Sequence, residues 1–190
     1  MRVVEVFNSI QGEGAYTGHA ASFVRLAGCN LRCHWCDTKE SWELSAGYEL
    51  ETIEIANRCQ RQIVILTGGE PLLQDISPLV SLLHDRGQQV HLETNGTLPL
   101  PDGINIDWVT VSPKFLSGYI LKPQKVDEVK LVMDNHLHEQ LIADLLMSYS
   151  LVYLQPESMK PQSINRCLEY IDKYPELKLS LQIHKILNIR

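Results

Sequence analysis

Short apolar stretches alternate with amphipathic stretches along most of the chain. Continuous apolar runs such as IVIL are typical of strands that are buried on both faces of a parallel sheet. The pattern predicts strands at Val3–Phe7, Ser22–Leu26, Gln62–Leu66, Gln89–Glu93, Trp108–Val111, Val129–Val132, Leu151–Leu154 and Leu177–Gln182, and helices at Leu50–Arg61, Ile76–Arg86, Leu137–Ser148 and Ser163–Lys173. This alternation indicates an α/β fold with right-handed crossover connections.

Two of the predicted connections, those after Glu93 and after Val111, are too short to hold full helices. A complete eight-unit barrel usually takes about 250 residues, whereas this chain has 190. We therefore predict a single domain over residues 1–190, folded as an incomplete TIM-type barrel with a curved parallel sheet and trimmed helices.

The polar motifs of the sequence directly follow the predicted strands. IVIL runs into TGGEP, VHLE into TNG, VTV into SPK, VYL into QPES, and LSLQ into IHK. In parallel α/β folds, ligands bind at the carboxyl ends of the strands. The five motifs are therefore expected to meet in one pocket.

Composition narrows the classes of function. The chain has 17 Lys and Arg against 23 Asp and Glu, a net charge of −6, which disfavours general nucleic-acid binding because phosphate contacts need clustered cations. No apolar run approaches the roughly 20 residues that span a bilayer, and the N-terminus lacks the apolar region of a signal peptide. We expect a cytoplasmic protein that binds neither nucleic acid nor membrane.

Three of the five cysteines form the cluster Cys29-x-x-x-Cys33-x-x-Cys36. Disulfides rarely persist in the cytoplasm, so this spacing indicates ligands for a metal or an iron–sulfur cluster. Cys59 and Cys167 lie among apolar neighbours in helix-like segments. They are expected to be buried free thiols.

Two kinds of metal centre compete for the three cysteines. A structural zinc site needs a fourth Cys or His, and His34, placed between two of the cysteines, is not expected to point inward with them. A catalytic zinc with a bound water stays open, as does a [4Fe–4S] cluster with one iron free for a substrate or cofactor. Ligand softness favours the iron–sulfur cluster.

Several other residues can be interpreted in two ways, as parts of a functional site or as purely structural residues. The two glycines of TGGEP let the backbone approach a ligand closely, or simply make a tight turn. Arg25, in the apolar context FVRLAG, needs an anionic partner, which is either a structural carboxylate or the carboxylate of a substrate. The QGEG segment can read the polar edge of a heterocycle or form a flexible loop. Thr38 can serve Mg²⁺ or cap a turn.

The cysteine spacing after an early strand, together with a strand that ends in Gly68-Gly69-Glu70, resembles the radical S-adenosylmethionine (SAM) superfamily. In that superfamily the open iron binds the amino and carboxylate groups of SAM. The resemblance implies a radical SAM core in which Cys29, Cys33 and Cys36 hold a [4Fe–4S] cluster.

The stretches EVFNSIQGEG, SFVRLAGCNLRCHWCDT, LTGGEP, ETNG, SPK and LQIHK resemble the 7-carboxy-7-deazaguanine synthases, radical SAM lyases of queuosine and deazapurine biosynthesis. The resemblance implies Mg²⁺-dependent ring contraction of 6-carboxy-5,6,7,8-tetrahydropterin to 7-carboxy-7-deazaguanine, with loss of ammonia. It also implies a flavodoxin-like electron donor and a homodimer.

Residue roles follow from the same resemblance. It implies substrate contacts by Ile10, Gln11, Gly12, Glu13, Arg25, Thr67, His184 and the carboxylate of Arg190, with Glu13, Arg25 and His184 as catalytic residues. It implies cofactor contacts by His34, Trp35, Gly69, Glu70, Ser112, Pro113, Lys114, Gln155 and Pro156, with Glu157 as a further candidate. Thr38 is expected to bind Mg²⁺.

Two alternative functions remain open from the residues. An activase that abstracts hydrogen from a glycine of a partner protein would share the cysteine spacing and the compact size, but it has no evident need for QGEG or a buried Arg25. A zinc-binding module without enzymatic activity would be colourless and would contain zinc in place of iron.

Overall fold

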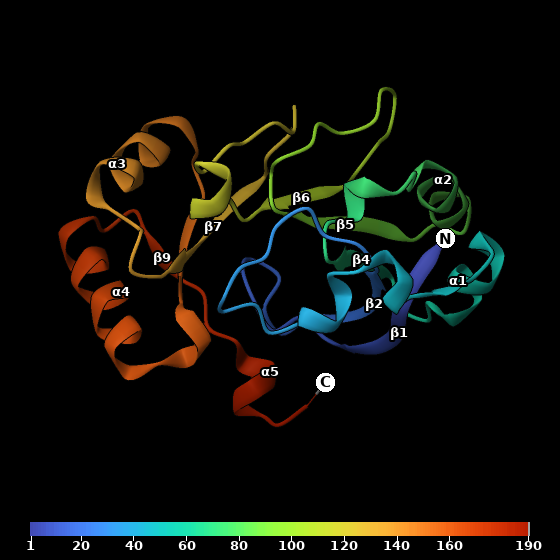
Figure 1. Ribbon diagram of the computed structural model, residues 1–190, viewed down its shortest axis with the longest axis horizontal. Coiled ribbons are helices and arrows are strands. Elements are labelled where there is room, and N and C mark those ends of the chain that lie inside the picture. Colours follow the sequence, from blue (N-terminus) through green and yellow to red (C-terminus); the bar gives the residue numbers. More distant parts are fainter. Residues whose placement is uncertain (190) are drawn as a thin grey trace.

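A single curved sheet organises the computed structural model of the protein, which describes residues 1–189 (Figure 1). Its strand order is β3-β1-β2-β4-β5-β6-β7-β8-β9. The strands are β1 (Arg2–Ile10), β2 (Ala20–Leu26), β3 (Tyr48–Glu49), β4 (Ile63–Gly68), β5 (Gln89–Thr94), β6 (Trp108–Val111), β7 (Glu128–Met133), β8 (Val152–Pro156) and β9 (Lys178–Leu179). From β2 to β9 every neighbouring pair is parallel, as the continuous apolar runs predict.

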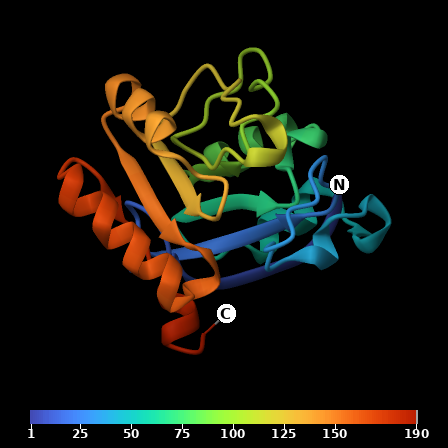
Figure 2. The same cartoon turned by 60° about the vertical axis from the view of Figure 1, so that its left-hand side comes forward.

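The helices cover the outer face of this sheet in two groups, one at each end (Figures 1 and 2). They are α1 (Thr52–Arg58) and α2 (Ser77–Asp85) at one end, and α3 (Glu139–Ser148) and α4 (Pro161–Lys173) at the other. The short helix α5 (Ile183–Ile186) lies apart from both groups. Within the described residues, the connections after β5 and β6 contain no α-helix, which confirms that they are too short for one. The predicted incomplete barrel with trimmed helices is therefore correct.

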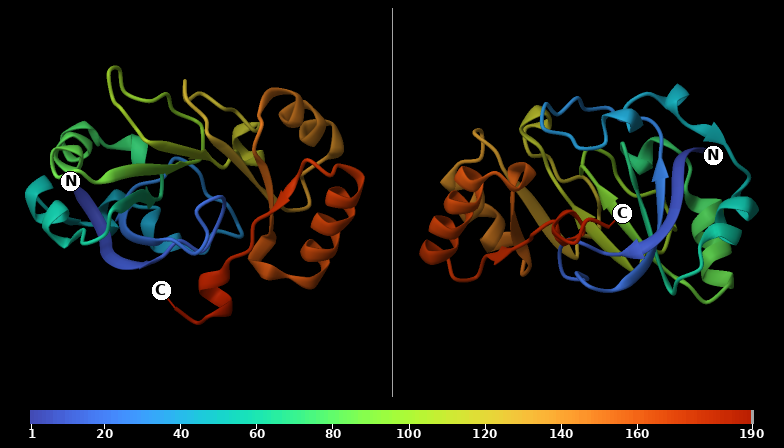
Figure 3. Two further views of the ribbon diagram at one scale, coloured as in Figure 1. Left: turned by 180° about the vertical axis from the view of Figure 1, so that it is seen from behind. Right: turned by 90° about the horizontal axis from the view of Figure 1, so that it is seen from below.

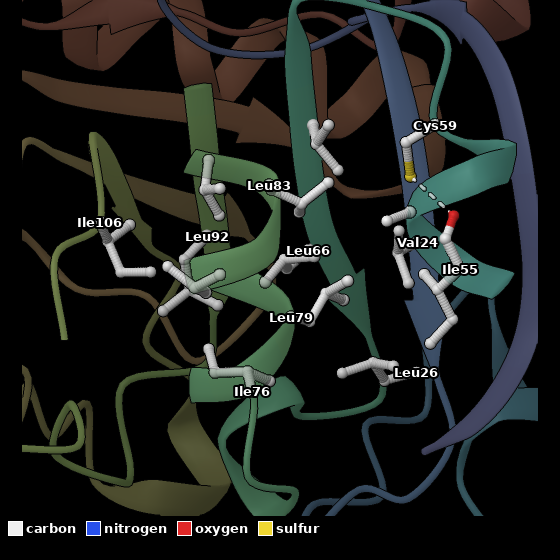
Figure 4. Close-up of a cluster of buried hydrophobic side chains, with 14 of the residues drawn as sticks. Val24, Leu26, Ile55, Cys59, Leu66, Ile76, Leu79, Leu83, Leu92 and Ile106 are labelled. Carbon is white, nitrogen blue, oxygen red and sulfur yellow. Dashed lines mark hydrogen bonds between the residues drawn. The ribbon is translucent and has the colours of Figure 1, made fainter. Parts of the chain in front are cut away.

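The larger hydrophobic core lies between the sheet and the helices α1 and α2 (Figure 4). Leu66 of β4 and Leu92 of β5 are fully buried against Leu79 and Leu83 of α2. The thiol of Cys59 is buried at the end of α1 and donates a hydrogen bond to the carbonyl of Ile55 at 3.3 Å. Strand and helix therefore share one apolar layer, which sets how α1 and α2 sit on the sheet.

A second apolar cluster fixes α3 and α4 against the far end of the sheet. Leu131 of β7 and Leu154 of β8 are fully buried there, beside Ile142 of α3 and Cys167 of α4. Cys59 and Cys167 are thus buried free thiols, as the sequence predicts. In the described part of the chain, no helix is long and apolar enough to cross a membrane.

The sheet differs from the predicted parallel arrangement at one edge. Strand β1 runs antiparallel to both β2 and β3. Nine residues separate β1 from β2, fewer than the dozen or more that a parallel crossover needs. The two-residue strand β3 was not predicted, because so short a segment carries no periodic pattern.

The predicted strand Leu177–Gln182 is also wrong in part. Only β9, over Lys178–Leu179, pairs with β8, and the chain then turns into α5. The backbone N–H of Ile183 donates to the carbonyl of Gly12 at 3.0 Å, so this segment leaves the sheet for the loop after β1. Both views of Figure 3 show α5 between the N-terminal strands β1 and β2 on one side and α4 on the other. His184 is therefore in a helical turn and not at a strand end.

Shortening a core side chain tests the packing of α2 on the sheet. We expect Leu79→Ala, at a fully buried position, to lower the free energy of unfolding by about 2–5 kcal/mol because it leaves a cavity. Met147→Ala is the matched control, since that side chain is 79% exposed and its change should stay within about 0.5 kcal/mol. Urea unfolding measures both, and equal effects would contradict this packing.

Candidate active site

A cavity of about 440 Å³ opens at the carboxyl ends of the parallel strands. All five strand-end motifs reach it, through Gly69, Asn95, Ser112, Gln155 and His184. Its volume falls within the usual range of small-molecule sites, about 300–1,000 Å³. The expected shared pocket is therefore present, although His184 reaches it from α5.

Most of the predicted site residues line this cavity. They are Ile10, Gln11, Gly12, Glu13, Arg25, Cys29, Cys33, Trp35, Cys36, Thr38, Thr67, Gly69, Ser112, Lys114, Gln155, Pro156 and His184. The exposed His34 and the buried Glu70, Pro113 and Glu157 do not line it. Arg190 lies outside the described residues. The roles proposed for these residues stay predictions.

Glu70 connects two loops at the cavity wall. Its fully buried carboxylate accepts hydrogen bonds from the backbone N–H of Leu72 at 3.1 Å, the hydroxyl of Thr94 at 2.8 Å and the backbone N–H of Asn95 at 2.7 Å. Burial raises the pKa of this carboxyl, against the lowering effect of those donors. The side chain thus holds the TGGEP turn to the TNG loop.

The glycines of TGGEP allow the cysteine loop to pack directly on the backbone of this turn. A side chain at Gly69 would place its Cβ 2.1 Å from the carbonyl oxygen of Gly28. That same carbonyl accepts the backbone N–H of Glu70 at 2.8 Å. Any residue larger than glycine would push the loop that starts at Cys29 away from the sheet.

The three clustered cysteines all line the cavity. Burial raises the pKa of the Cys29 and Cys33 thiols. Within residues 1–189, no three His, Cys, Asp or Glu side chains converge as the ligands of a single metal ion would. Three soft thiols that share one cavity suit an iron–sulfur cluster, whose irons are held by cysteine thiolates.

Trp35 anchors the cysteine loop to the opposite side of the barrel. Its indole N–H donates to the carboxylate of Asp134, just beyond β7, at 3.0 Å. The ammonium group of Lys114 lies 5.1 Å from the centre of the Trp35 ring and also contacts the Ser112 hydroxyl. Burial lowers the pKa of Lys114 to about 8. The loop is therefore held from both β6 and β7.

Arg25 lies on a cavity wall with two aromatic rings. Its Nε donates to the Glu5 carboxylate at 2.8 Å, so the structural anionic partner exists. The guanidinium carbon lies 6.0 Å from the centre of the Phe7 ring, which stacks on Phe23 with centroids 4.9 Å apart. This wall offers a flat apolar surface beside a cation, which suits a planar ring that carries a carboxylate.

The QGEG segment is tied down by its contacts and does not behave as a free loop. The backbone N–H of Glu13 donates to the side-chain oxygen of Gln11 at 3.1 Å. A Cβ at Gly12 would lie 2.2 Å from Nδ1 of His184, so only glycine permits this approach. Gly12 therefore brings Glu13 and His184 into the same part of the cavity.

Several cavity residues were not predicted from the sequence. They include Phe7, Phe23, Trp42, Glu93, Lys130, Gln182 and Lys185. One pattern was available for Lys130, which is a single charge within the apolar strand VKLVM. The same pattern singles out Arg25, because an isolated charge among buried residues needs a partner.

Comparisons with known proteins agree with this architecture. The Radical SAM superfamily matches residues 24–138. The 7-carboxy-7-deazaguanine synthase of Bacteroides thetaiotaomicron is 40% identical over the whole chain and 98% of that protein, and that of Escherichia coli is 34% identical over 97% of each. The chain belongs to the 7-carboxy-7-deazaguanine synthase family.

A solved structure extends the likeness to the 7-carboxy-7-deazaguanine synthase fold. The crystal structure of QueE from Escherichia coli matches 95% of this chain and 93% of that protein, with a TM-score of 0.76 and 30% sequence identity. The family resemblance and the partial-barrel prediction are confirmed. Membership in the family makes the chain a radical SAM enzyme and implies a [4Fe–4S] cluster, SAM and a small-molecule substrate.

Removing one cluster ligand tests the cysteine assignment. After anaerobic reconstitution we expect Cys33→Ala to hold far fewer than the ~4 iron atoms of an intact cluster and to cleave no SAM under reducing conditions. Cys59→Ala is the control, because that thiol is buried outside the cavity and should leave the iron content unchanged. Normal iron content and normal 5′-deoxyadenosine formation in Cys33→Ala would refute the assignment.

Proposed function

We propose that the chain converts 6-carboxy-5,6,7,8-tetrahydropterin to 7-carboxy-7-deazaguanine, with loss of ammonia, in queuosine biosynthesis. Family membership supports this reaction. The observation that carries it in the structure is one cavity lined both by three cysteines and by Glu13 and Arg25. With a cluster on the three cysteines, such a cavity would hold a radical source beside a polar surface suited to the substrate ring.

The cysteine end of the cavity is proposed to hold the cofactors. Cys29, Cys33 and Cys36 would bind the cluster, which with SAM supplies radical hydrogen abstraction. The Gly69 backbone, Trp35, Ser112, Lys114, Gln155 and Pro156 would hold SAM, and all six line the cavity. His34, Glu70 and Pro113 would act at most through the loops they belong to, since their side chains lie off the lining.

The other end is proposed to hold the pterin. The Glu13 carboxylate accepts hydrogen bonds, so it suits the amino group of a pterin ring. Arg25 would bind the substrate carboxylate from the wall of Phe7 and Phe23, with His184 beside Gly12. Ile10, Gln11 and Thr67 complete this surface. Packing the bound pterin ring against aromatic and apolar side chains would also exclude water from the reaction.

Thr38 is proposed to place Mg²⁺ between the two ends. It lines the cavity, and its hydroxyl lies 3.6 Å from the sulfur of Cys36. The neighbouring Asp37 carboxylate already pairs with Lys185 at 2.7 Å and accepts from Gln182 at 3.0 Å. Mg²⁺ commonly binds one or two protein oxygens and keeps its other positions for waters and substrate, which fits a lone threonine hydroxyl.

The remaining proposals rest on the family resemblance. Reductive cleavage of SAM needs a one-electron donor, which we propose is flavodoxin-like. We also propose a homodimer of single domains that works in the cytoplasm.

Anaerobic turnover tests the reaction. Reconstituted protein given SAM, a reductant, Mg²⁺ and the carboxypterin should release 7-carboxy-7-deazaguanine, identified by the mass of the product. SAM should be regenerated, so that 5′-deoxyadenosine does not accumulate in proportion to product. Absence of the deazapurine, with a glycyl radical formed on a partner protein, would instead establish the activase.

Thr38→Ala tests the magnesium site. The variant should cleave SAM normally, because the cysteines are intact, while its product formation should respond much less to added Mg²⁺. The readout is turnover across a Mg²⁺ titration. A Mg²⁺ response identical to that of the unchanged protein would remove Thr38 from the site.

A further inference from the structure

Lys130 is a buried cation inside the barrel that has no role in the reaction proposed above. It lies on β7, its side chain is 5% exposed, and it lines the cavity. Burying a charge is costly unless the charge is paired. The partners of Lys130 therefore show what this position is for.

Two carboxylates share the ammonium group of Lys130. It forms an ion pair with Oε2 of Glu13, from the loop after β1, and lies 3.5 Å from Oε2 of Glu93 at the end of β5. Both carboxylates line the cavity, and their side chains are 14% and 24% exposed. Lys130 of β7 thus joins β5 and the loop after β1 at one point on the cavity wall.

Two amide side chains complete the arrangement. Gln182 donates to Oε1 of Glu13 at 2.8 Å, and Gln11 donates to Oε1 of Glu93 at 2.8 Å. Each carboxylate therefore has one oxygen held by an amide and the other held by Lys130. An ionised carboxylate has about four acceptor positions, so both keep the capacity to accept hydrogen bonds from a ligand.

The charges around Lys130 favour the ionised forms of both Lys130 and Glu13. Burial alone would raise the pKa of Glu13, but the nearby Lys130 outweighs it and holds that pKa below its usual value. Burial would likewise lower the pKa of Lys130, yet Glu13 and Glu93 raise it well above its usual value. Glu128, hydrogen-bonded by Ala15 N–H and the Thr110 hydroxyl, adds a third carboxyl nearby, and Lys114 a second cation.

We propose that Lys130 is a positioning residue that holds Glu13 and Glu93 together as charged acceptors for the N–H donors of the substrate ring. This inference rests on the proposed function, since it takes the pterin as the ligand. Buried ion pairs add little to stability compared with apolar packing. A pair that faces a ligand cavity is therefore better accounted for by recognition than by folding.

The arrangement also selects the ligand. Two adjacent carboxylates accept hydrogen bonds and cannot donate them. The amino group and ring N–H of a pterin match such a pair, whereas a ring with acceptors at those positions would face two negative charges. Without Lys130, the two carboxylates would repel each other or one would take up a proton, and the acceptor pair would be lost.

The test compares Lys130→Met, which removes the charge at similar length, with Lys130→Arg, which keeps it. We expect Lys130→Met to raise KM for the carboxypterin about 10- to 100-fold, with kcat changed little. A change of this size corresponds to the usual contribution of charge-assisted hydrogen bonds to binding. Lys130→Arg should recover most of the affinity. Reductive SAM cleavage without the pterin should be normal in both, because the cysteine end is untouched. Lys125→Met, outside the cavity, is the matched control.

The outcomes separate this inference from the proposed function. If the unchanged protein makes no deazapurine, the proposed function fails. If it does, and Lys130→Met keeps a normal KM or loses kcat alone, the inference about Lys130 is overturned. Should Lys130→Met fail to fold, Lys130→Met/Glu93→Gln removes one negative charge together with the cation, and a normal KM in that double variant would overturn the inference.

Discussion

Parallel pairing of six successive strands is the constraint on which the site depends. The strands β2, β4, β5, β6, β7 and β8 all run in one direction, so their carboxyl ends lie on one edge of the sheet. The loops that follow these strands therefore surround a common cavity. The cysteine loop follows β2, and the TGGEP turn follows β4. The close contact between Gly28 and Gly69 holds the start of the cysteine loop against the TGGEP turn.

Buried charges organise the part of the cavity wall that contains Arg25 and Lys130. Arg25 and Lys130 each lie on an apolar strand and form an ion pair with a carboxylate. Arg25 pairs with Glu5 of the neighbouring strand β1, and Lys130 pairs with Glu13 of the loop after β1. The side-chain amide of Gln182 also donates to the Glu13 carboxylate at 2.8 Å. The cavity therefore presents a cation beside aromatic rings on one wall and a pair of acceptors on another, and a planar ring with a carboxylate at one edge and N–H donors at the other is complementary to both.

Local sequence patterns predicted most of the strands, the clustering of Cys29, Cys33 and Cys36 and the strand-end motifs, because each depends on neighbouring residues. What could not be predicted arises from distant contacts. Lys130 and Glu13 are 117 positions apart, and Gly12 meets His184 only after α5 turns toward the first loop. Glu70 shows that a residue within a predicted ligand-binding motif need not face the ligand, since its side chain is hydrogen-bonded to Thr94 and Asn95. Sequence identifies the chemistry that is available, and tertiary contacts decide which groups face the ligand.

An anaerobic crystal structure with SAM and the carboxypterin tests the shared cavity most directly. We expect SAM beside Cys29, Cys33 and Cys36, and the pterin with ring N–H groups within about 3.2 Å of the Glu13 and Glu93 carboxylates. A pterin bound outside this cavity, or one whose acceptor edge faces these carboxylates, would contradict it.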